Sequence, residues 1–157
     1  MTEINIFNEI IEDEKFKQEK KFIQHGDMTV YEHSVEVAKT CVRIAEKLNL
    51  DVDYKSLVKG ALLHDYFLYD WHIYHPSHKL HGFTHPRVAR DNAKRDFGLT
   101  KKEENMILTH MFPLVPRLPK YKESILLCLA DKYCATKETL FRSRVYRRLK
   151  KLLYNTN

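Results

Sequence analysis

The fold and the chemistry of this chain are decided by the stretch Gly60-Ala61-Leu62-Leu63-His64-Asp65, where an apolar run ends in a histidine followed by an aspartate. Residues three and four apart share one face of a helix, so Leu57, Ala61 and the His64-Asp65 doublet lie on one side. The doublet is therefore directed toward the protein interior. A buried carboxylate beside an imidazole is costly unless a cation or hydrogen bonds compensate its charge. The rest of the chain is expected to supply this compensation.

The composition is that of a single globular domain, with 157 residues, 43% of them hydrophobic and 31% charged. Four glycines and five prolines are too few for the many turns of a β-sandwich or barrel and favour an all-α fold. The three cysteines stand singly in apolar helical patterns and indicate reduced thiols. The sequence contains no apolar signal core and no run long enough to span a bilayer. We therefore expect a cytoplasmic protein with no membrane attachment.

Apolar periodicity and capping signals predict six or seven helices. Capping boxes of the form Thr-x-x-Glu start two of them, at Thr29 and Thr100. Thr84 is expected to cap another helix, with Pro86 in its first turn and Gly98 at its end. The expected helices cover residues 4–23, 30–48, 54–65, 85–97, 101–110, 121–135 and 137–153, the last of them strongly basic.

Six polar residues, from five of these helices, lie on apolar faces or interrupt them. A single buried histidine is ordinarily a hydrogen-bonded core residue, but six such residues together favour a metal site. Imidazole and carboxylate without thiolate suit iron or manganese first, and also cobalt, zinc, nickel or magnesium. Six ligands exceed what one catalytic ion takes from a protein, so the pattern predicts two divalent metal ions. The predicted ligands are His33, His64, Asp65, His85, His110 and Asp131.

This order of residues resembles the HD superfamily of metal-dependent phosphohydrolases, in the version with two additional histidines between the doublet and the last aspartate. The local settings agree, because Tyr31-Glu32-His33-Ser34 opens a helix and Leu129-Ala130-Asp131-Lys132 lies in the last core helix. The resemblance covers residues 31–135 and implies one HD domain over residues 1–157. The chain is also similar to small uncharacterised bacterial HD proteins that contain Tyr-Asp-Trp-His and His-Gly-Phe-Thr-His-Pro stretches.

The resemblance implies a division of the ligands between two ions, with Asp65 as the bridge. His33, His64, Asp65 and Asp131 would hold the first ion, and His85 and His110 the second. Two cations lower the pKa of a shared water and neutralise phosphate oxygens. The implied activity is hydrolysis, by a metal-bound hydroxide, of a phosphoester or phosphoanhydride in a nucleotide or another small phosphorylated substrate. His64 and Asp65 are accordingly expected to be catalytic.

The chain departs from many two-metal relatives, which have a phosphate-binding lysine shortly after the doublet. Here Tyr66-Phe67-Leu68-Tyr69-Asp70 follows, so the substrate contacts must come from other residues. Arg87 and Lys132 are expected to be catalytic as well as substrate-binding, although an ordinary surface cation is an equally good interpretation of each. The full set of expected substrate contacts is His72, Lys79, His81, Arg87 and Lys132.

Residues 66–81 are expected to form an ordered loop over the site. Its histidines at every third position suggest a row of metal ligands, but Pro76 breaks the run and substrate contact is the favoured interpretation. Tyr66, Tyr69, Trp71 and Phe83 would either stack on a nucleobase or pack on the core.

Two other functional classes remain open. The net charge of +6 and the basic residues near the C-terminus favour an acidic partner, and a protein that binds or processes nucleic acid is the alternative. The residues concerned are Arg144, Arg147, Arg148 and Lys151, for which a solvated basic helix face is the ordinary interpretation. A catalytically silent binding module is the third class. The sequence leaves the oligomeric state open between a monomer and a homodimer.

Overall fold

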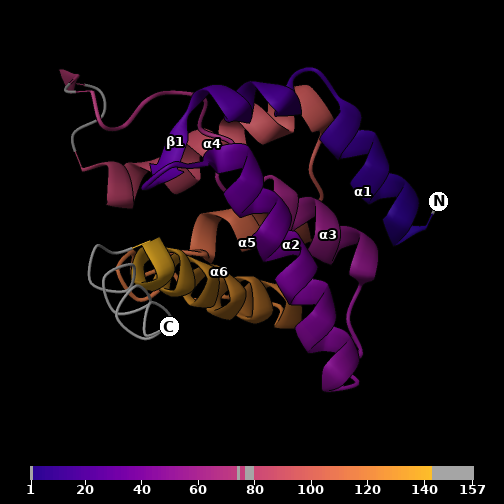
Figure 1. Cartoon of the computed structure of the whole chain (residues 1–157). Coiled ribbons are helices and arrows are strands. Elements are labelled where there is room, and N and C mark those ends of the chain that lie inside the picture. The colour runs from indigo at the N-terminus through magenta and orange to yellow at the C-terminus, as the bar shows by residue number, and fades with distance from the viewer. Residues whose placement is uncertain (1, 74, 77–79, 143–157) are drawn as a thin grey trace, which may run out of the picture.

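Helices build almost all of the structure, as the all-α prediction requires. A computed structural model of the chain describes residues 2–73, 75–76 and 80–142, and its elements are shown in Figure 1. They are α1 (Glu3–Glu12), η1 (Phe16–Lys21, a 3-10 helix), β1 (Ile23–His25), β2 (Met28–Thr29), α2 (Val30–Lys47), α3 (Tyr54–Leu62), α4 (His81–Phe97), α5 (Lys101–Thr109) and α6 (Lys122–Arg142). Among the described residues, no helix has the length and apolar character needed to cross a lipid bilayer.

Helix α3 lies at the centre of the fold. It packs against α1, α2, α5 and α6, so helices surround it on several sides (Figure 1). Leu57, Ala61, Leu62 and Leu63 are completely buried there. The helix itself ends at Leu62, and the His64-Asp65 doublet occupies the turn directly after it rather than the last helical turn. The central helix therefore delivers the doublet to the middle of the molecule.

Both predicted capping boxes are confirmed. The Thr29 hydroxyl accepts the Glu32 amide hydrogen, the Glu32 carboxylate accepts the Thr29 amide hydrogen, and α2 begins at Val30. Thr100 and Glu103 start α5 in the same way. These caps satisfy amide groups that have no partner inside the helix, and so fix where each helix begins. The first cap places His33 in the first buried turn of α2.

The helix predicted over residues 4–23 is wrong in its second half. Helix α1 ends at Glu12, and Asp13 has extended backbone angles. The Asp13 carboxylate accepts the Lys15 amide hydrogen at 2.7 Å, a local turn that competes with the helix. The chain then forms η1, whose Phe16 is completely buried, and a short β1–β2 hairpin turning at Gly26 with a φ of +65°.

Helix α4 begins one turn earlier than predicted. Leu80 precedes it in a left-handed conformation, and the amide groups of Phe83 and Thr84 already donate to the Leu80 carbonyl. Thr84 is therefore inside the helix rather than at its cap, and Pro86 lies beyond the first turn. The early start places His81 and His85, four residues apart, on one face. Gly98 ends the helix as predicted.

Helix α6 continues past the predicted end at Ala135 to Arg142. Residues 137–142 thus belong to α6 and do not begin a separate helix. The remainder of the predicted basic helix, with Arg144, Arg147, Arg148 and Lys151, lies outside the described residues.

The distance between α3 and α5 depends on Gly60. A Cβ atom at this position would lie 2.6 Å from Met106 Cε and 2.8 Å from Met106 Sδ. Gly60 and Met106 each precede a site histidine by four residues, His64 and His110 respectively, so their contact sets how closely the two histidines approach. Their rings meet edge to face with centroids 5.0 Å apart.

We therefore expect Gly60→Val to lower the free energy of unfolding by about 2 kcal/mol, because the buried Met106 side chain must move. Urea denaturation of the purified protein measures this change. The double variant Gly60→Val/Met106→Ala should cost less than the sum of the two single variants. Simple additivity would show that the two residues do not limit the approach of the helices.

Candidate metal centre

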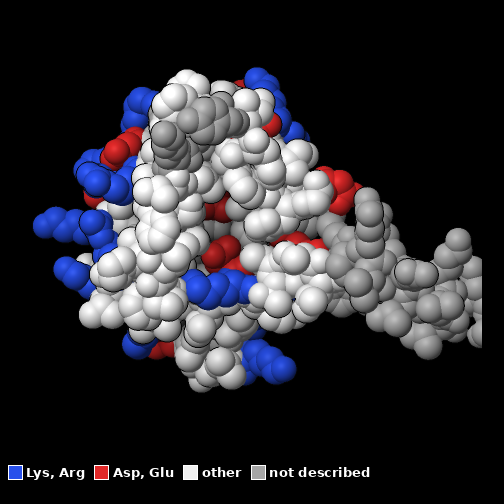
Figure 2. Space-filling view, turned by 90° about the vertical axis from the view of Figure 1, so that its left-hand side faces the viewer, with Lys and Arg blue, Asp and Glu red and all other residues white. Residues whose placement is uncertain are grey.

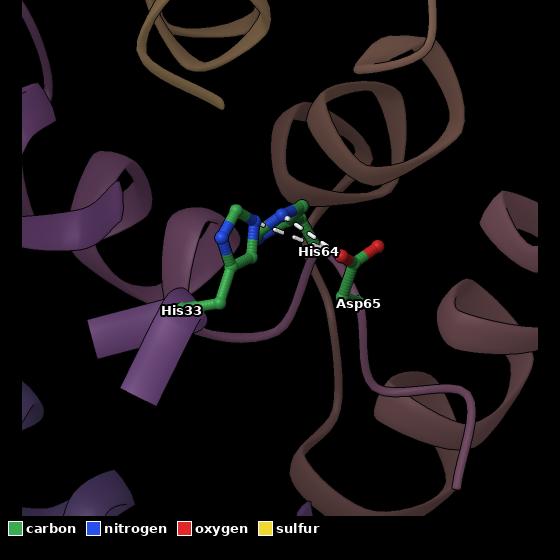
Figure 3. Close-up of side chains that lie close together, drawn as sticks. All are labelled: His33, His64 and Asp65. Atoms are coloured by element: carbon green, nitrogen blue, oxygen red, sulfur yellow. Dashed lines mark ion pairs between the residues drawn. The ribbon is translucent and has the colours of Figure 1, made fainter. Parts of the chain in front are cut away.

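The structure brings all six predicted metal ligands together at the centre of the bundle. Each side chain is buried, although they come from five separate parts of the chain. Figure 3 shows how His33 of α2 and the doublet after α3 point toward one another. The ligand atoms form three overlapping groups, and within each group they all lie within 4.8 Å of one another. They are His33, His64 and Asp65, then His64, His110 and Asp131, then Asp65, His85 and His110.

One side of the cluster contains two carboxylate oxygens facing two imidazoles. His33 Nε2 lies 3.1 Å from Asp131 Oδ1 and 3.9 Å from Asp65 Oδ2. His64 Nε2 lies 3.5 Å from the same Asp131 oxygen and 3.4 Å from the same Asp65 oxygen. Four potential ligand atoms therefore converge on one point.

The other side uses the second oxygen of Asp65. His85 Nε2 lies 3.2 Å from Asp65 Oδ1, and His110 Nε2 lies 3.4 Å from it. The two ring nitrogens are 2.9 Å apart. Asp65 thus presents one oxygen to each pair of imidazoles, which is the arrangement of a bridging carboxylate.

The outer nitrogen of each imidazole is held by an acceptor, and this determines the tautomer. His64 Nδ1 donates to the Ala61 carbonyl at 2.7 Å and His110 Nδ1 to the Ile107 carbonyl at 2.7 Å. His85 Nδ1 donates to the His81 carbonyl at 2.8 Å. A carbonyl can only accept, so Nδ1 carries the hydrogen and the neutral ring offers the Nε2 lone pair to the interior. This is the arrangement found in metal-binding histidines.

These residues fit a divalent cation. His64 Nε2 and Asp65 Oδ1 are buried and have no hydrogen-bond partner among the described residues. The facing lone pairs of His85 and His110 would repel each other unless a proton or cation lay beside them. Ligand atoms that share one ion, with bonds of about 2.1 Å, lie roughly 3.0–3.4 Å apart. Five of the six spacings between Nε2 and carboxylate oxygen atoms, at 3.1–3.5 Å, are close to this range, and only the distance from His33 to Asp65, 3.9 Å, is longer.

The charges of the cluster are strongly coupled. Burial alone would lower the pKa of His33, but hydrogen bonds with Asp131 and Glu138 raise it to about 9. Burial also opposes the charged form of His64, yet Asp65 and Asp131 hold its pKa well above the usual value. The imidazoles in turn outweigh burial at Asp65 and Asp131 and lower the pKa of both carboxyl groups. The carboxylates are thus ionised and attract positive charge, as a metal site requires.

Two residues that were not predicted from the sequence contact the predicted metal ligands. Both carboxylate oxygens of Glu138 lie 3.0 Å from His33 Nδ1, and Gln24 Nε2 donates to Asp65 Oδ2 at 2.6 Å. Glu138 follows Asp131 by seven residues, so a longer prediction for α6 would have placed it on the same face. Gln24 lies in strand β1, which has only three residues and is too short to show a periodic pattern.

A cavity of about 720 Å³ opens onto the cluster. Figure 2 shows a hollow with acidic side chains in its depth and mostly uncharged residues around it. Of the expected substrate contacts, His81 and Lys132 line the cavity, together with Asp65 and Asp131. Lys132 Nζ donates to the His110 carbonyl at 2.8 Å and also lies 3.1 Å from Cys128 Sγ.

The other expected contacts lie elsewhere. Arg87 is exposed and is not among the described lining residues, and His72 is exposed beside Asp70, which accepts its amide hydrogen. Lys79 lies outside the described residues. Among the aromatics, Tyr66 is buried and donates to Asp96, which is core packing, whereas Trp71 lines the cavity.

Comparison with known proteins identifies the family. The family model described as the HD domain matches residues 30–136. The chain belongs to the HD-domain family. It is also similar to ribonuclease Y of Pseudothermotoga lettingae, with 32% identity over 117 residues, or 74% of this chain and 20% of that protein. The chain thus spans about a fifth of the length of this relative. No solved structure matches the chain. HD domains bind divalent metals and in general act as metal-dependent phosphohydrolases.

The Glu138–His33 contact generates a prediction about metal affinity. Glu138→Ala removes the acceptor that orients His33, so affinity for manganese should fall about tenfold or more. Glu138→Gln keeps an oxygen that accepts the Nδ1 hydrogen and should lose less. Competition with a chromophoric chelator measures both affinities.

Glu36→Ala is the matched control, because Glu36 lies on α2 and pairs only loosely, at 3.6 Å, with the exposed Arg43. It should bind manganese as the unchanged protein does. An equal affinity in Glu138→Ala would show that Glu138 does not hold His33 for metal binding.

Proposed function

We propose that this protein is a metal-dependent phosphohydrolase that cleaves a phosphoester or phosphoanhydride bond in a nucleotide or another small phosphorylated substrate. The observation that carries this proposal is the Asp65 carboxylate, whose two oxygens each face a separate pair of imidazole Nε2 atoms. Such a set of ligands suits two divalent ions that share one carboxylate. The cavity leads from the surface directly to this point.

The residues divide into two groups of ligands. His33, His64 and Asp131 would hold one ion with Asp65, and His85 and His110 would hold the other with the same aspartate. Two bound divalent ions lower the pKa of a water molecule and neutralise phosphate oxygens. The protein orients these ligands through Glu138, Gln24 and three backbone carbonyls, so that little reorganisation is needed during the reaction.

Two lining residues remain for the substrate itself. Lys132 places a positive charge at the cavity, where it would attract a phosphate. His81 lines the cavity next to His85, and its Nδ1 lies 2.8 Å from the Tyr69 hydroxyl. We assign His81 as the residue that protonates the leaving group, a role that an imidazole can perform near neutral pH.

A second candidate function is cleavage of RNA, which the similarity to ribonuclease Y favours. On this alternative, the arginines near the C-terminus would bind the RNA backbone. The affinity for an RNA oligonucleotide would then fall steeply with salt, and would be lost on changing Arg144, Arg147 and Arg148 to glutamine. Under the phosphohydrolase proposal we expect weak RNA binding and faster hydrolysis of small phosphorylated compounds. Gel-shift and hydrolysis assays at several salt concentrations decide between the two.

The phosphohydrolase proposal is tested by removing the central ligands. Protein purified without chelators should contain about two divalent ions per chain and release phosphate from small phosphorylated compounds. His64→Ala and Asp65→Asn should lose bound metal and reduce phosphate release to background. Elemental analysis and a phosphate assay with added manganese measure both properties.

Asp70→Asn provides the control, because this acid follows the doublet closely but lies on the partly exposed loop beside His72. It should keep both metal and activity. Undiminished activity in the metal-stripped His64→Ala or Asp65→Asn protein would refute the mechanism.

A further inference from the structure

A second hollow, of about 400 Å³, lies between one face of α5 and the end of the loop that leads to α6. Among the described residues, none lines both this hollow and the cavity over the ligand cluster. It is therefore a separate surface that the phosphohydrolase proposal does not use. Its lining residues include Lys101, Glu104, Asn105, Arg117, Lys120 and Tyr121.

Three exposed cations line this hollow, and none of them has an ion-pair partner within the described part of the chain. They are Lys101, Arg117 and Lys120. The acid of the hollow, Glu104, is held instead by two cations of α4, by Arg90 at 3.2 Å and by Lys94 at 2.8 Å. Like charges that share one hollow repel each other, and an anion between them removes this repulsion. The hollow is therefore prepared for an anionic ligand.

The neighbouring hollow shows that lysines on this side of the molecule are not always unpaired. It shares Lys120 with the first hollow, but its other lysines have acidic partners. Lys102 Nζ lies 3.0 Å from Glu123 Oε1, and Lys122 Nζ lies 3.7 Å from Asp51 Oδ2. The unpaired charge is thus confined to the hollow on the α5 side.

Two helix N-termini add to the positive charge. Helix α5 begins at Lys101, and α6 begins at Lys122, the residue directly after Tyr121. The N-terminal end of a helix carries a partial positive charge that attracts anions. Because both helices begin at this hollow, their dipoles act in the same sense as its three cations.

The loop that carries two of the cations is held in place. Asn105 Oδ1 accepts the Lys120 amide hydrogen at 3.0 Å and the Ser124 hydroxyl hydrogen at 2.9 Å, which fastens the end of the loop to α5. Pro116 and Pro119 fix two further backbone φ angles of the loop. The cations are therefore positioned by the fold before any ligand binds.

The exposure of the cations indicates the class of anion that they would bind. An exposed cation gains little from one isolated phosphate, because water and salt screen the pair. A nucleic-acid strand binds differently, since each phosphate that meets a cation releases a condensed counterion. The half-buried Leu108 and Tyr121 also offer apolar surface in the hollow. An unpaired base can cover such a surface, whereas the bases of a duplex are already stacked on one another.

We propose that this hollow binds the phosphate backbone of single-stranded nucleic acid through Lys101, Arg117 and Lys120. The inference does not rest on the proposed phosphohydrolase function, because the surface does not include the metal centre. Contacts with so few phosphates give weak binding at physiological salt, with a dissociation constant of ~10⁻⁴–10⁻⁶ M, as for non-specific binding in general. Such binding is compatible with either candidate function.

Removal of the three cations tests the assigned surface. The probe is a fluorescein-labelled oligouridylate of about twelve nucleotides, with methylated 2′-oxygens that slow its hydrolysis. Fluorescence polarisation at several salt concentrations gives its affinity for the manganese-loaded protein. The variant Lys101→Gln/Arg117→Gln/Lys120→Gln should bind about tenfold more weakly or more at low salt. The slope of log affinity against log salt concentration should fall in magnitude by about 2, since each phosphate contact of a single strand contributes about 0.7.

A second triple variant, Lys39→Gln/Lys47→Gln/Lys55→Gln, is the matched control. It removes the same number of exposed cations, but from α2 and α3 and not from this hollow. Its affinity should fall at most about twofold, because only long-range attraction is lost. Both triple variants should release phosphate from p-nitrophenyl phosphate as the unchanged protein does.

The outcomes distinguish this surface from a general effect of charge. An equal loss of affinity in the two triple variants would overturn the inference, because net charge alone would then bind the strand. Failure of the unchanged protein to bind the oligouridylate at low salt would overturn it as well. Equally tight binding of a duplex of the same length, or of inorganic triphosphate, would overturn the single strand as the ligand. Phosphate release is measured separately, so the proposed function can fail while this inference stands, and the reverse.

Discussion

The burial of the Asp65 carboxylate is the constraint on which the rest of the structure depends. This side chain is only 2% exposed, and an ionised carboxylate at such a depth is unstable without positive charge around it. A helix begins or ends near each of four histidines, and as a result four Nε2 atoms face the two oxygens of the Asp65 carboxylate. Asp65 therefore determines where α2, α3, α4 and α5 must meet.

Helix ends are also what hold the histidines in place. The last carbonyl groups of a helix have no amide partner within it. Ala61 and Ile107 lie in the last turns of α3 and α5, and their carbonyls accept the Nδ1 hydrogens of His64 and His110, each three residues later. One hydrogen bond thus satisfies the helix end and fixes the tautomer of a predicted ligand. His85 lies inside α4 and instead donates to the His81 carbonyl, which belongs to the first turn of that helix.

The sequence was sufficient for the parts of this design that depend on local patterns. The all-α class, the capping boxes at Thr29 and Thr100, and the six inward polar residues all follow from periodicity and helix-end signals. The structure brings these six together, and their role as metal ligands remains a prediction for experiment. The failures have a different origin. Asp13 interrupts a helix through a side-chain turn, α4 starts early from a left-handed Leu80, and Gln24 reaches Asp65 from a hairpin. Each depends on contacts or backbone angles that no periodic pattern records.

Gln24 and Glu138, the two residues that were not predicted, lie at positions along the chain that affect how function can vary within the family. Gln24 precedes the HD region of residues 30–136 and Glu138 follows it, yet each contacts a predicted ligand directly. Gln24 is 8% exposed and lines the cavity as well, so it affects both the Asp65 carboxylate and the space inside the cavity. In this chain all six predicted ligands lie inside the HD region, whereas these two groups lie outside it. Differences in metal affinity and substrate choice can therefore arise without any change in the ligands, because the groups that orient them lie outside the region that defines the family.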